Sequence, residues 1–209
     1  MFRFSVKPKV FCIGQNKTGT TSLGAALKDL GYRVGDQTEA EKLVEDWARR
    51  DFTRLVRYCR SADAFQDVPF SLDYTYQVLH YAFPGSKFIL TVRDSADVWY
   101  ESLIRFHTKL LGKNHLPTPD ELRAFPYHKG GWLWRIQELV YDATEESLYD
   151  RQKYVAHYER HNEQVQDYFR HRADALLILN LADSDALVRL CAFLGKPFSG
   201  GVMPHLNMS

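Results

Sequence analysis

Residues 14–22 have the types and spacing that bind a phosphate or another anion. Their sequence is GQNKTGTTS, and they follow an apolar run at residues 10–13 and precede a helical pattern. Glycines let backbone N–H groups turn inward, and a helix N-terminus carries a partial positive charge. Residues 1–28 also contain five basic residues and no Asp or Glu: Arg3, Lys7, Lys9, Lys17 and Lys28. The segment therefore favours an anion site.

The lysine of this loop does not stand where a Walker A loop has it. Gly14 and Gly19 match the Walker glycine frame, which requires a lysine directly after the second glycine. That position is Thr20, whereas Lys17 stands two residues before Gly19. The alternative to an anion site is a glycine turn in which Thr20 or Thr21 caps the next helix.

A second group suited to phosphate follows the apolar run at residues 88–92. Arg93 stands at the end of this run, and α/β sheets bind ligands at the carboxyl ends of their parallel strands. Ser102 lies on the predicted helix that follows. An arginine fork together with a hydroxyl binds a phosphate monoester. The alternative is that Arg93 only pairs with Asp94 or Asp97 at the start of that helix.

The elements that would position these groups alternate along the chain. Continuous apolar runs at 10–13, 88–92 and 176–179, with a weaker one at 62–66, are typical of strands that helices cover on both faces. Helical periodicity lies between and after them: 23–30, 99–110, 147–170 and about 184–194. We therefore expect an α/β fold, a three-layer α/β/α arrangement with a mostly parallel central sheet.

The chain length of 209 residues suits one domain spanning residues 1–209. Glycine and proline interrupt the pattern around 112–131, so we expect an irregular insertion or lid at about 105–135. The three cysteines are widely spaced and form no C-x-x-C pair, which indicates neither a disulfide framework nor a zinc site.

Composition and charge exclude other classes of protein. Lys and Arg total 27 against 26 Asp and Glu, so the net charge is +1, and we expect no nucleic-acid partner held by bulk charge. No apolar stretch approaches the ~20 residues of a membrane span. A strand beginning by Val10 leaves no room for a removable leader. A cytoplasmic protein is the resulting expectation.

These segments together resemble sulfotransferases that use 3′-phosphoadenosine 5′-phosphosulfate (PAPS). Residues 17–22, KTGTTS, look like their 5′-phosphosulfate loop. Arg93 and Ser102 are similar to their 3′-phosphate-binding element, although the interval between them is longer than the family usually has. The stretches 190–197 and 204–207 resemble one branch of the superfamily. The resemblance spans nearly the whole chain and implies a P-loop NTPase-like sulfotransferase fold.

The resemblance implies direct transfer of a sulfuryl group from PAPS to an acceptor hydroxyl or amine. The product would be 3′-phosphoadenosine 5′-phosphate (PAP), and no metal is required. The implied donor-binding residues are Lys17, Thr18, Gly19, Thr20, Thr21, Ser22, Arg93 and Ser102. Lys17 would serve the bridging oxygen of the leaving phosphate. We expect a small-molecule or glycan acceptor, with the insertion at 105–135 on the acceptor side.

An acceptor hydroxyl needs a base, and the resemblance points to Asp67. Sulfotransferases have a His or Glu shortly after the second strand, where this chain has Asp67-Val68-Pro69. A carboxylate is a weak base at neutral pH unless its surroundings raise its pKa. The alternative is that Asp67 only orders the turn before the next helix. Three histidines compete for the role, each more typical of a surface or lid: His107, His115 and His128.

Two other functions remain open. A P-loop nucleotide kinase or NTPase needs a lysine after Gly19 and an aspartate that ends a hydrophobic strand for magnesium. Thr20 occupies the first position and Asn180 follows the last apolar run, although Asp94 follows Arg93. A non-catalytic nucleotide-binding protein would keep the same loops.

Overall fold

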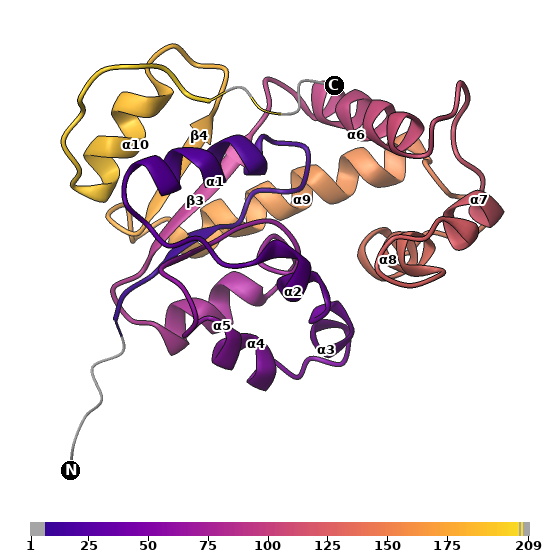
Figure 1. Ribbon diagram of the computed structural model, residues 1–209, viewed down its shortest axis with the longest axis horizontal. Coiled ribbons are helices and arrows are strands. Elements are labelled where there is room, and N and C mark those ends of the chain that lie inside the picture. Colours follow the sequence, from indigo (N-terminus) through magenta and orange to yellow (C-terminus); the bar gives the residue numbers. More distant parts are fainter. Residues whose placement is uncertain (1–6, 205, 207–209) are drawn as a thin grey trace. The chain divides into compact units, whose positions relative to one another are not determined.

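The computed structural model describes residues 7–204 and residue 206, and its chain forms two compact units (Figure 1). One unit comprises Met1–Arg93 and Asn162–Met208 and contains the sheet. The other comprises Asp94–His161 and is helical. We call them the sheet unit and the helical unit. The prediction that residues 1–209 form one sulfotransferase-like domain stays a prediction.

The sheet has four strands, all parallel, in the order β2-β1-β3-β4. Their bounds are β1 Val10–Cys12, β2 Ala64–Phe65, β3 Lys87–Val92 and β4 Leu176–Asn180. Each lies within or beside one of the predicted apolar runs, which confirms the parallel α/β class. Because neighbouring strands run in the same direction, the segments that follow β2, β1 and β3 all leave from the same edge of the sheet.

One face of the sheet carries an aromatic core around Phe11 of β1. Its ring centroid lies 5.7 Å from that of Phe65 on β2 and 5.5 Å from that of Phe88 on β3. Phe70 and Phe83 pack on the same ring at 6.2 and 5.8 Å. All five side chains are at most 1% exposed. Aromatic contacts of this kind hold the first three strands together on this face.

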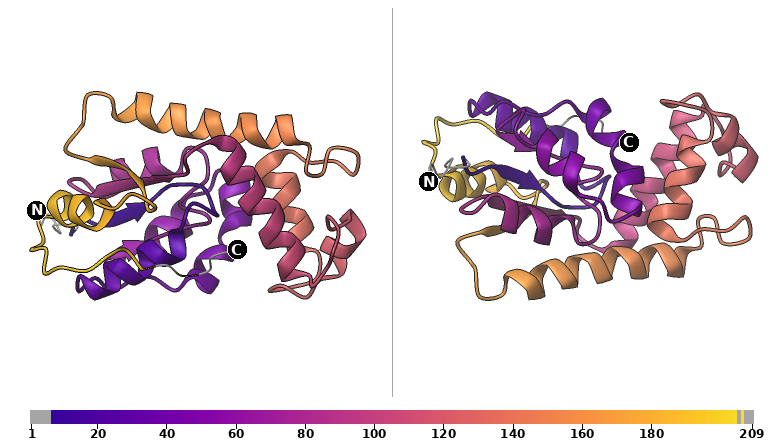
Figure 2. Two further views of the ribbon diagram at one scale, coloured as in Figure 1. Left: turned by 90° about the horizontal axis from the view of Figure 1, so that it is seen from above. Right: turned by 90° about the horizontal axis from the view of Figure 1, so that it is seen from below.

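Helices cover both faces of the sheet, as seen from above and below in Figure 2. Alternate strand residues point to opposite sides, so Phe11 and Phe88 enter one core cluster while Cys12 and Ile89 enter the other. The first cluster includes residues of α4, α5 and the C-terminal part of α9, and the second includes residues of α1 and α10. These three layers confirm the predicted α/β/α architecture.

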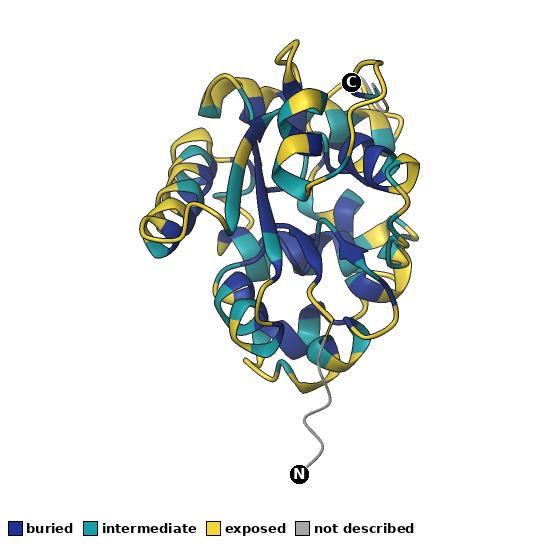
Figure 3. Ribbon diagram, turned by 90° about the vertical axis from the view of Figure 1, so that its left-hand side faces the viewer, coloured by how far each residue is buried: buried dark blue, intermediate teal, exposed yellow. Residues whose placement is uncertain are grey.

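The helices of the sheet unit have these bounds: α1 Thr20–Asp29, α2 Gln37–Glu41, α3 Val44–Ala48, α4 Thr53–Tyr58, α5 Thr75–Ala82 and α10 Ala186–Leu194. Helix α9, Arg151–Phe169, begins in the helical unit and ends in the sheet unit. Figure 3 shows that most of the sheet is buried, whereas the edge strand β4 is partly exposed.

The helical unit consists of α6 Ala96–Leu110, α7 Pro119–Ala124, α8 Trp132–Tyr141 and the first part of α9. Its core stacks Trp99 on Tyr158, with ring centroids 4.6 Å apart, and Tyr141 on Tyr154 at 4.3 Å. Parts of α6 and α8 and the whole of α7 lie within residues 105–135, so this segment contains more helix than its glycines and prolines predicted. A capping box starts α7 where these prolines cluster.

The buried face of α6 differs in one respect from the predicted stripe. His107 is 4% exposed, whereas Phe106 is only partly buried. The Nδ1 atom of His107 lies 2.9 Å from the hydroxyl of Tyr149, so a hydrogen bond compensates for burying the imidazole. The prediction that His107 belongs to a surface or lid is wrong about the surface, because a hydrogen bond with Tyr149 of the same unit satisfies the imidazole inside the core.

Replacing Phe11 by Ala should lower the free energy of unfolding by about 3–5 kcal/mol, because the change leaves a cavity among four packed rings. Urea denaturation measures the effect. The control is Tyr81→Ala, since Tyr81 is 89% exposed and its loss should cost less than about 0.5 kcal/mol. Equal effects of the two substitutions would contradict the assigned core.

Candidate active site

The loop between β1 and α1 turns through two left-handed residues. Lys17 has φ 66° and Gly19 has φ 95°, and Gly19 is the N-cap of α1. The N-cap position is held by a glycine, which has no side chain to cap the helix, so the alternative in which Thr20 or Thr21 serves as the cap is wrong. Left-handed backbone costs a non-glycine residue such as Lys17 on the order of 1 kcal/mol. The loop therefore leaves its first helical N–H groups without a side-chain cap.

The loop lies directly against β3. A Cβ atom on Gly14 would fall 2.2 Å from Oγ1 and 2.4 Å from the carbonyl oxygen of Thr91, so only glycine fits there. The hydroxyl of Thr18 is 2.5 Å from the carbonyl oxygen of Gln15 and 2.5 Å from Oγ1 of Thr91. Thr18 and Thr91 are fully buried. The contact between Thr18 and Thr91 therefore holds the loop close to β3.

Arg93 joins the loop from the end of β3, as the sequence predicted. Its Nε donates a hydrogen bond of 2.8 Å to the carbonyl oxygen of Lys17. Burial is the main reason why the pKa of Lys17 lies below the ordinary lysine value, and Arg93 lowers that pKa further. The carboxylate of Asp67 acts in the opposite direction. Lys17 therefore lies near a second cation, Arg93, and near the carboxylate of Asp67.

Asp67 follows β2 and is held in place by two donors. The hydroxyl of Thr20 donates to its Oδ2 at 2.7 Å, and the backbone N–H of Val68 donates to its Oδ1 at 2.8 Å. Asp67 also has a left-handed backbone, with φ 59°. Thr20, which stands where a Walker loop has lysine, thus connects the first turn of α1 to the candidate base.

The sheet order explains why these groups meet. Strand β1 lies between β2 and β3, so its loop is flanked by Asp67 on one side and Arg93 on the other. Residues 47 positions apart (Thr20 and Asp67) and 76 positions apart (Lys17 and Arg93) come together because three parallel strands end at one edge. The structure thus brings Lys17, Thr18, Thr20, Asp67 and Arg93 together.

Ser22 and Ser102 have different surroundings. Ser22 is buried, and its Oγ accepts a hydrogen bond from the N–H of Leu206 at 3.0 Å and lies 3.3 Å from the carbonyl oxygen of Leu206. Ser102 is 3% exposed on α6 of the helical unit. The exposed Thr21 completes the first turn of α1. Their roles in binding stay predictions.

The three histidines considered as alternative bases belong to the helical unit and not to this loop. His115 and His128 are exposed residues of the helical unit, and His107 is in its core. His205 and Asn207 of the C-terminal stretch lie outside the described residues. All three cysteines are buried, and burial raises the pKa of Cys12 and Cys59. In the described part of the chain, no group of three or more His, Cys, Asp or Glu side chains could hold a metal ion.

Sequence reasoning missed Thr91, Gln15 and Leu181 as residues that support the loop. Gln15 is buried and its amide donates to the carbonyl oxygen of Ser71 at 3.2 Å. Leu181 packs over Gly19, where a Cβ atom would lie 2.4 Å from its Cδ1. Thr91 had a signal in the sequence, since it is the one polar residue inside the apolar run 88–92. No comparable signal marks Gln15 or Leu181.

Comparison with known proteins places the chain among sulfuryl-transfer proteins. The family model described as a sulfotransferase domain matches residues 9–209. No curated protein matches the chain. Among solved structures, a gluconokinase from Sinorhizobium meliloti 1021 is similar over 91% of this chain and 93% of that chain, with 13% sequence identity and a TM-score of 0.48. Within the described residues, no helix is long and apolar enough to cross a membrane.

Replacing Gly14 by Ala should lower the free energy of unfolding by about 1–3 kcal/mol, because the new methyl group meets backbone atoms of Thr91 that cannot rotate away. Gly130→Ala is the matched control, since a Cβ there meets nothing within 4 Å and should change stability by less than about 0.5 kcal/mol. Thermal denaturation compares the two. A Gly14→Ala protein as stable as the control would contradict the close approach of the loop to β3.

Proposed function

This chain belongs to the family of sulfotransferase domains, and from that premise we propose that it transfers a sulfuryl group from PAPS to a hydroxyl or amine of an acceptor. The observation that carries the proposal is the position of Lys17. Its side chain is partly buried in an anion-binding type of loop, near the charged groups of Arg93 and Asp67. Transfer by direct displacement needs these groups and no covalent enzyme intermediate.

The loop fits the 5′-phosphosulfate of such a donor. Helix α1 begins at Gly19 without a side-chain cap, so its first N–H groups suit a bound anion. Burial is the main cause that lowers the pKa of Lys17, so a nearby anion would favour its charged form. A phosphosulfate beside Lys17 would compensate that charge. Residues 18–22 would supply the remaining hydrogen-bond donors.

PAPS, when bound, supplies a sulfuryl group attached to a phosphate that is a good leaving group. Lys17 would stabilise the negative charge that grows on the bridging oxygen as the S–O bond breaks. Arg93 holds the carbonyl oxygen of Lys17, so it positions the loop and would also face the 3′-phosphate with Ser102 as the family resemblance suggests. The protein's part is alignment and charge stabilisation, as in phosphoryl transfer.

Asp67 is the proposed base. As the acceptor oxygen forms its bond to sulfur, its proton would pass to the Asp67 carboxylate. Thr20 and Val68 each donate to one of the two carboxylate oxygens and so hold the group in one orientation. Each oxygen has a further lone pair that can accept the proton. This assignment gives Thr20 a positioning role in place of the phosphate contact of a Walker lysine.

The acceptor is proposed to be a small molecule or a glycan, and location in the cytoplasm stays a prediction. The P-loop kinase or NTPase alternative has less support, because Thr20 donates to Asp67 in the position where those enzymes have lysine. A non-catalytic nucleotide-binding protein would bind PAP but would not turn over PAPS. The two experiments below separate these alternatives.

PAP should stabilise the protein, whereas ADP with magnesium should not. At 100 times its Kd a ligand adds about 2.7 kcal/mol to the free energy of unfolding. Arg93→Ala should remove most of the stabilisation by PAP. Arg172→Ala, at an exposed position far along the chain, is the control and should keep it. Stabilisation by ADP with magnesium alone would favour the kinase alternative.

Lys17→Ala should reduce turnover of radiolabelled PAPS across a panel of small-molecule and glycan acceptors by roughly 100-fold or more, because the charge on the leaving oxygen loses its cation. Asp67→Asn keeps the shape of the side chain and should lower kcat by about 100-fold with little change in PAP binding. Full activity of Asp67→Asn would remove it as the base. Wild-type binding of PAP without turnover of any acceptor would favour a non-catalytic protein.

A further inference from the structure

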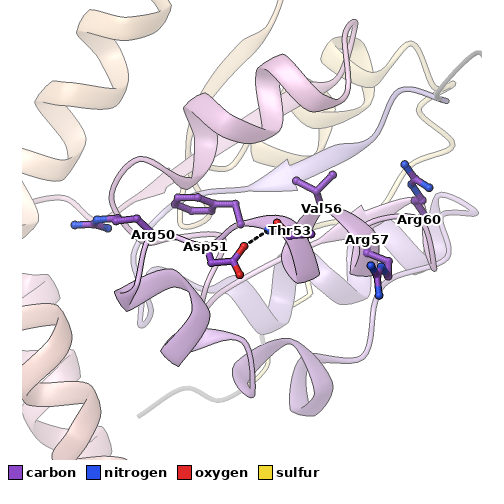
Figure 4. A pocket seen from close by; sticks show the side chains of 7 residues that line it. Arg50, Asp51, Thr53, Val56, Arg57 and Arg60 are labelled. Carbon is purple, nitrogen blue, oxygen red and sulfur yellow. Dashed lines mark hydrogen bonds between the residues drawn. The ribbon is translucent and has the colours of Figure 1, made fainter.

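A hollow in the sheet unit lies outside residues 14–22, the loop that we call the donor loop. It has a volume of about 540 Å³, within the range of small-ligand sites. Its lining residues belong to one stretch of chain at and around α4: Arg50, Asp51, Phe52, Thr53, Val56, Arg57 and Arg60. Figure 4 shows Arg50 at one end, Arg57 and Arg60 at the other, and Asp51, Thr53 and Val56 between them. We call it the arginine hollow.

The arginine hollow lies in a strongly basic part of a nearly neutral protein. Residues 49–60 contain five arginines and one acid, so their net charge is +5 − 1 = +4. The whole chain has a net charge of +1, which leaves −3 for all other residues. Two of them, Arg54 and Arg57, stand three positions apart on α4, where like charges destabilise a helix slightly. An anion bound at Arg57 would reduce that repulsion.

The five arginines do not all have partners. Arg49 and Arg54 both pair with the buried carboxylate of Asp46, and so they have a structural role. Arg50 lies over the rings of Trp47 and Tyr74, at 4.9 and 4.7 Å. These interactions account for three of the five charges and leave Arg57 and Arg60 to be explained.

Among the described residues, Arg57 and Arg60 line the hollow with neither a counter-ion nor an aromatic ring as partner, whereas Arg50 has the rings of Trp47 and Tyr74. Among residues 7–204 and 206, neither forms an ion pair or a side-chain hydrogen bond. Both are exposed and stand three positions apart at the end of α4. Their guanidinium groups can each bind a carboxylate or sulfate through two parallel hydrogen bonds. The hollow therefore has an unused anion-binding capacity at one end.

The rest of the lining suits a ligand that carries hydroxyl groups. Asp51 is exposed, and hydrogen bonds from Thr53 lower its pKa, so it is a charged acceptor at neutral pH. Thr53 has a hydroxyl that both donates and accepts. Phe52 and Val56 are partly buried and provide apolar surface. A simple inorganic anion would use only the arginines and would be repelled by Asp51.

We propose that the arginine hollow binds an acidic saccharide. Its sulfate or carboxylate groups would pair with Arg57 and Arg60, its hydroxyl groups would donate to Asp51, and the face of a sugar ring would lie on Phe52. None of the lining residues belongs to the donor loop, so the site is separate from the one that the sulfuryl-transfer proposal uses. It stands whether or not the protein turns over PAPS.

Isothermal titration calorimetry of the full-length protein with a chondroitin sulfate tetrasaccharide tests the proposal. The saccharide should bind the wild type. Arg57→Ala/Arg60→Ala should raise its Kd at least about tenfold, because two charge-assisted contacts are lost. The matched control is Lys42→Ala/Arg49→Ala, which removes the same charge from two residues that already have acidic partners. Its Kd should stay within about twofold of the wild type. PAP binding should be the same in all three proteins.

Four results would overturn the proposal: no binding of the acidic saccharide to the wild type, equal weakening in both double variants, equal binding of the neutral tetra-N-acetylchitotetraose, or binding of inorganic sulfate as tight as that of the tetrasaccharide. Circular dichroism confirms that each variant is folded, which the exposure of all four substituted residues favours. If PAP fails to bind while the tetrasaccharide binds as expected, the sulfuryl-transfer proposal fails and this one stands.

Discussion

The absence of a side chain at Gly14 is the constraint on which the candidate site depends. It allows the loop after β1 to lie against the backbone of Thr91 on β3, and the Thr18–Thr91 contact then holds the loop at that distance. Lys17 takes its left-handed conformation within this short loop, and Arg93 reaches its carbonyl oxygen from the end of the same strand. A larger residue at position 14 would separate the loop from the strand that supplies its second cation.

Local charge, and not total charge, accounts for both proposed anion sites. The chain is close to neutral, yet Lys17 and Arg93 lie together at the donor loop and four net positive charges are concentrated in residues 49–60. The two sites differ in how their cations are surrounded. Lys17 is partly buried and near the Asp67 carboxylate, whereas Arg57 and Arg60 are exposed and line a hollow. Salt screens exposed charges more than partly buried ones, so the two sites should differ in how strongly salt weakens anion binding.

Much of the fold and the donor loop could be predicted from the sequence, because the signals are local. Continuous apolar runs gave the parallel strands, and the glycine frame gave the loop. The predictions failed where the surroundings of a residue depend on parts of the structure that its local sequence does not show. Histidine is a polar residue that the sequence alone would place at the surface of α6. The hydrogen bond with Tyr149 compensates for burying its imidazole. Thr20 and Thr21 are good helix caps by type, but the left-handed Gly19 takes that position.

By itself the sequence determined the class of fold and the family to which the chain belongs, and it predicted an anion site at residues 14–22, since each depends on residues that are neighbours along the chain. Only the tertiary structure decided that Asp67 accepts a hydrogen bond from Thr20 and that Arg93 holds Lys17. It also decided which of five neighbouring arginines have counter-ions. The physical reason is that hydrogen bonds and ion pairs act over a few ångströms, and strand order alone determines which distant residues come that close.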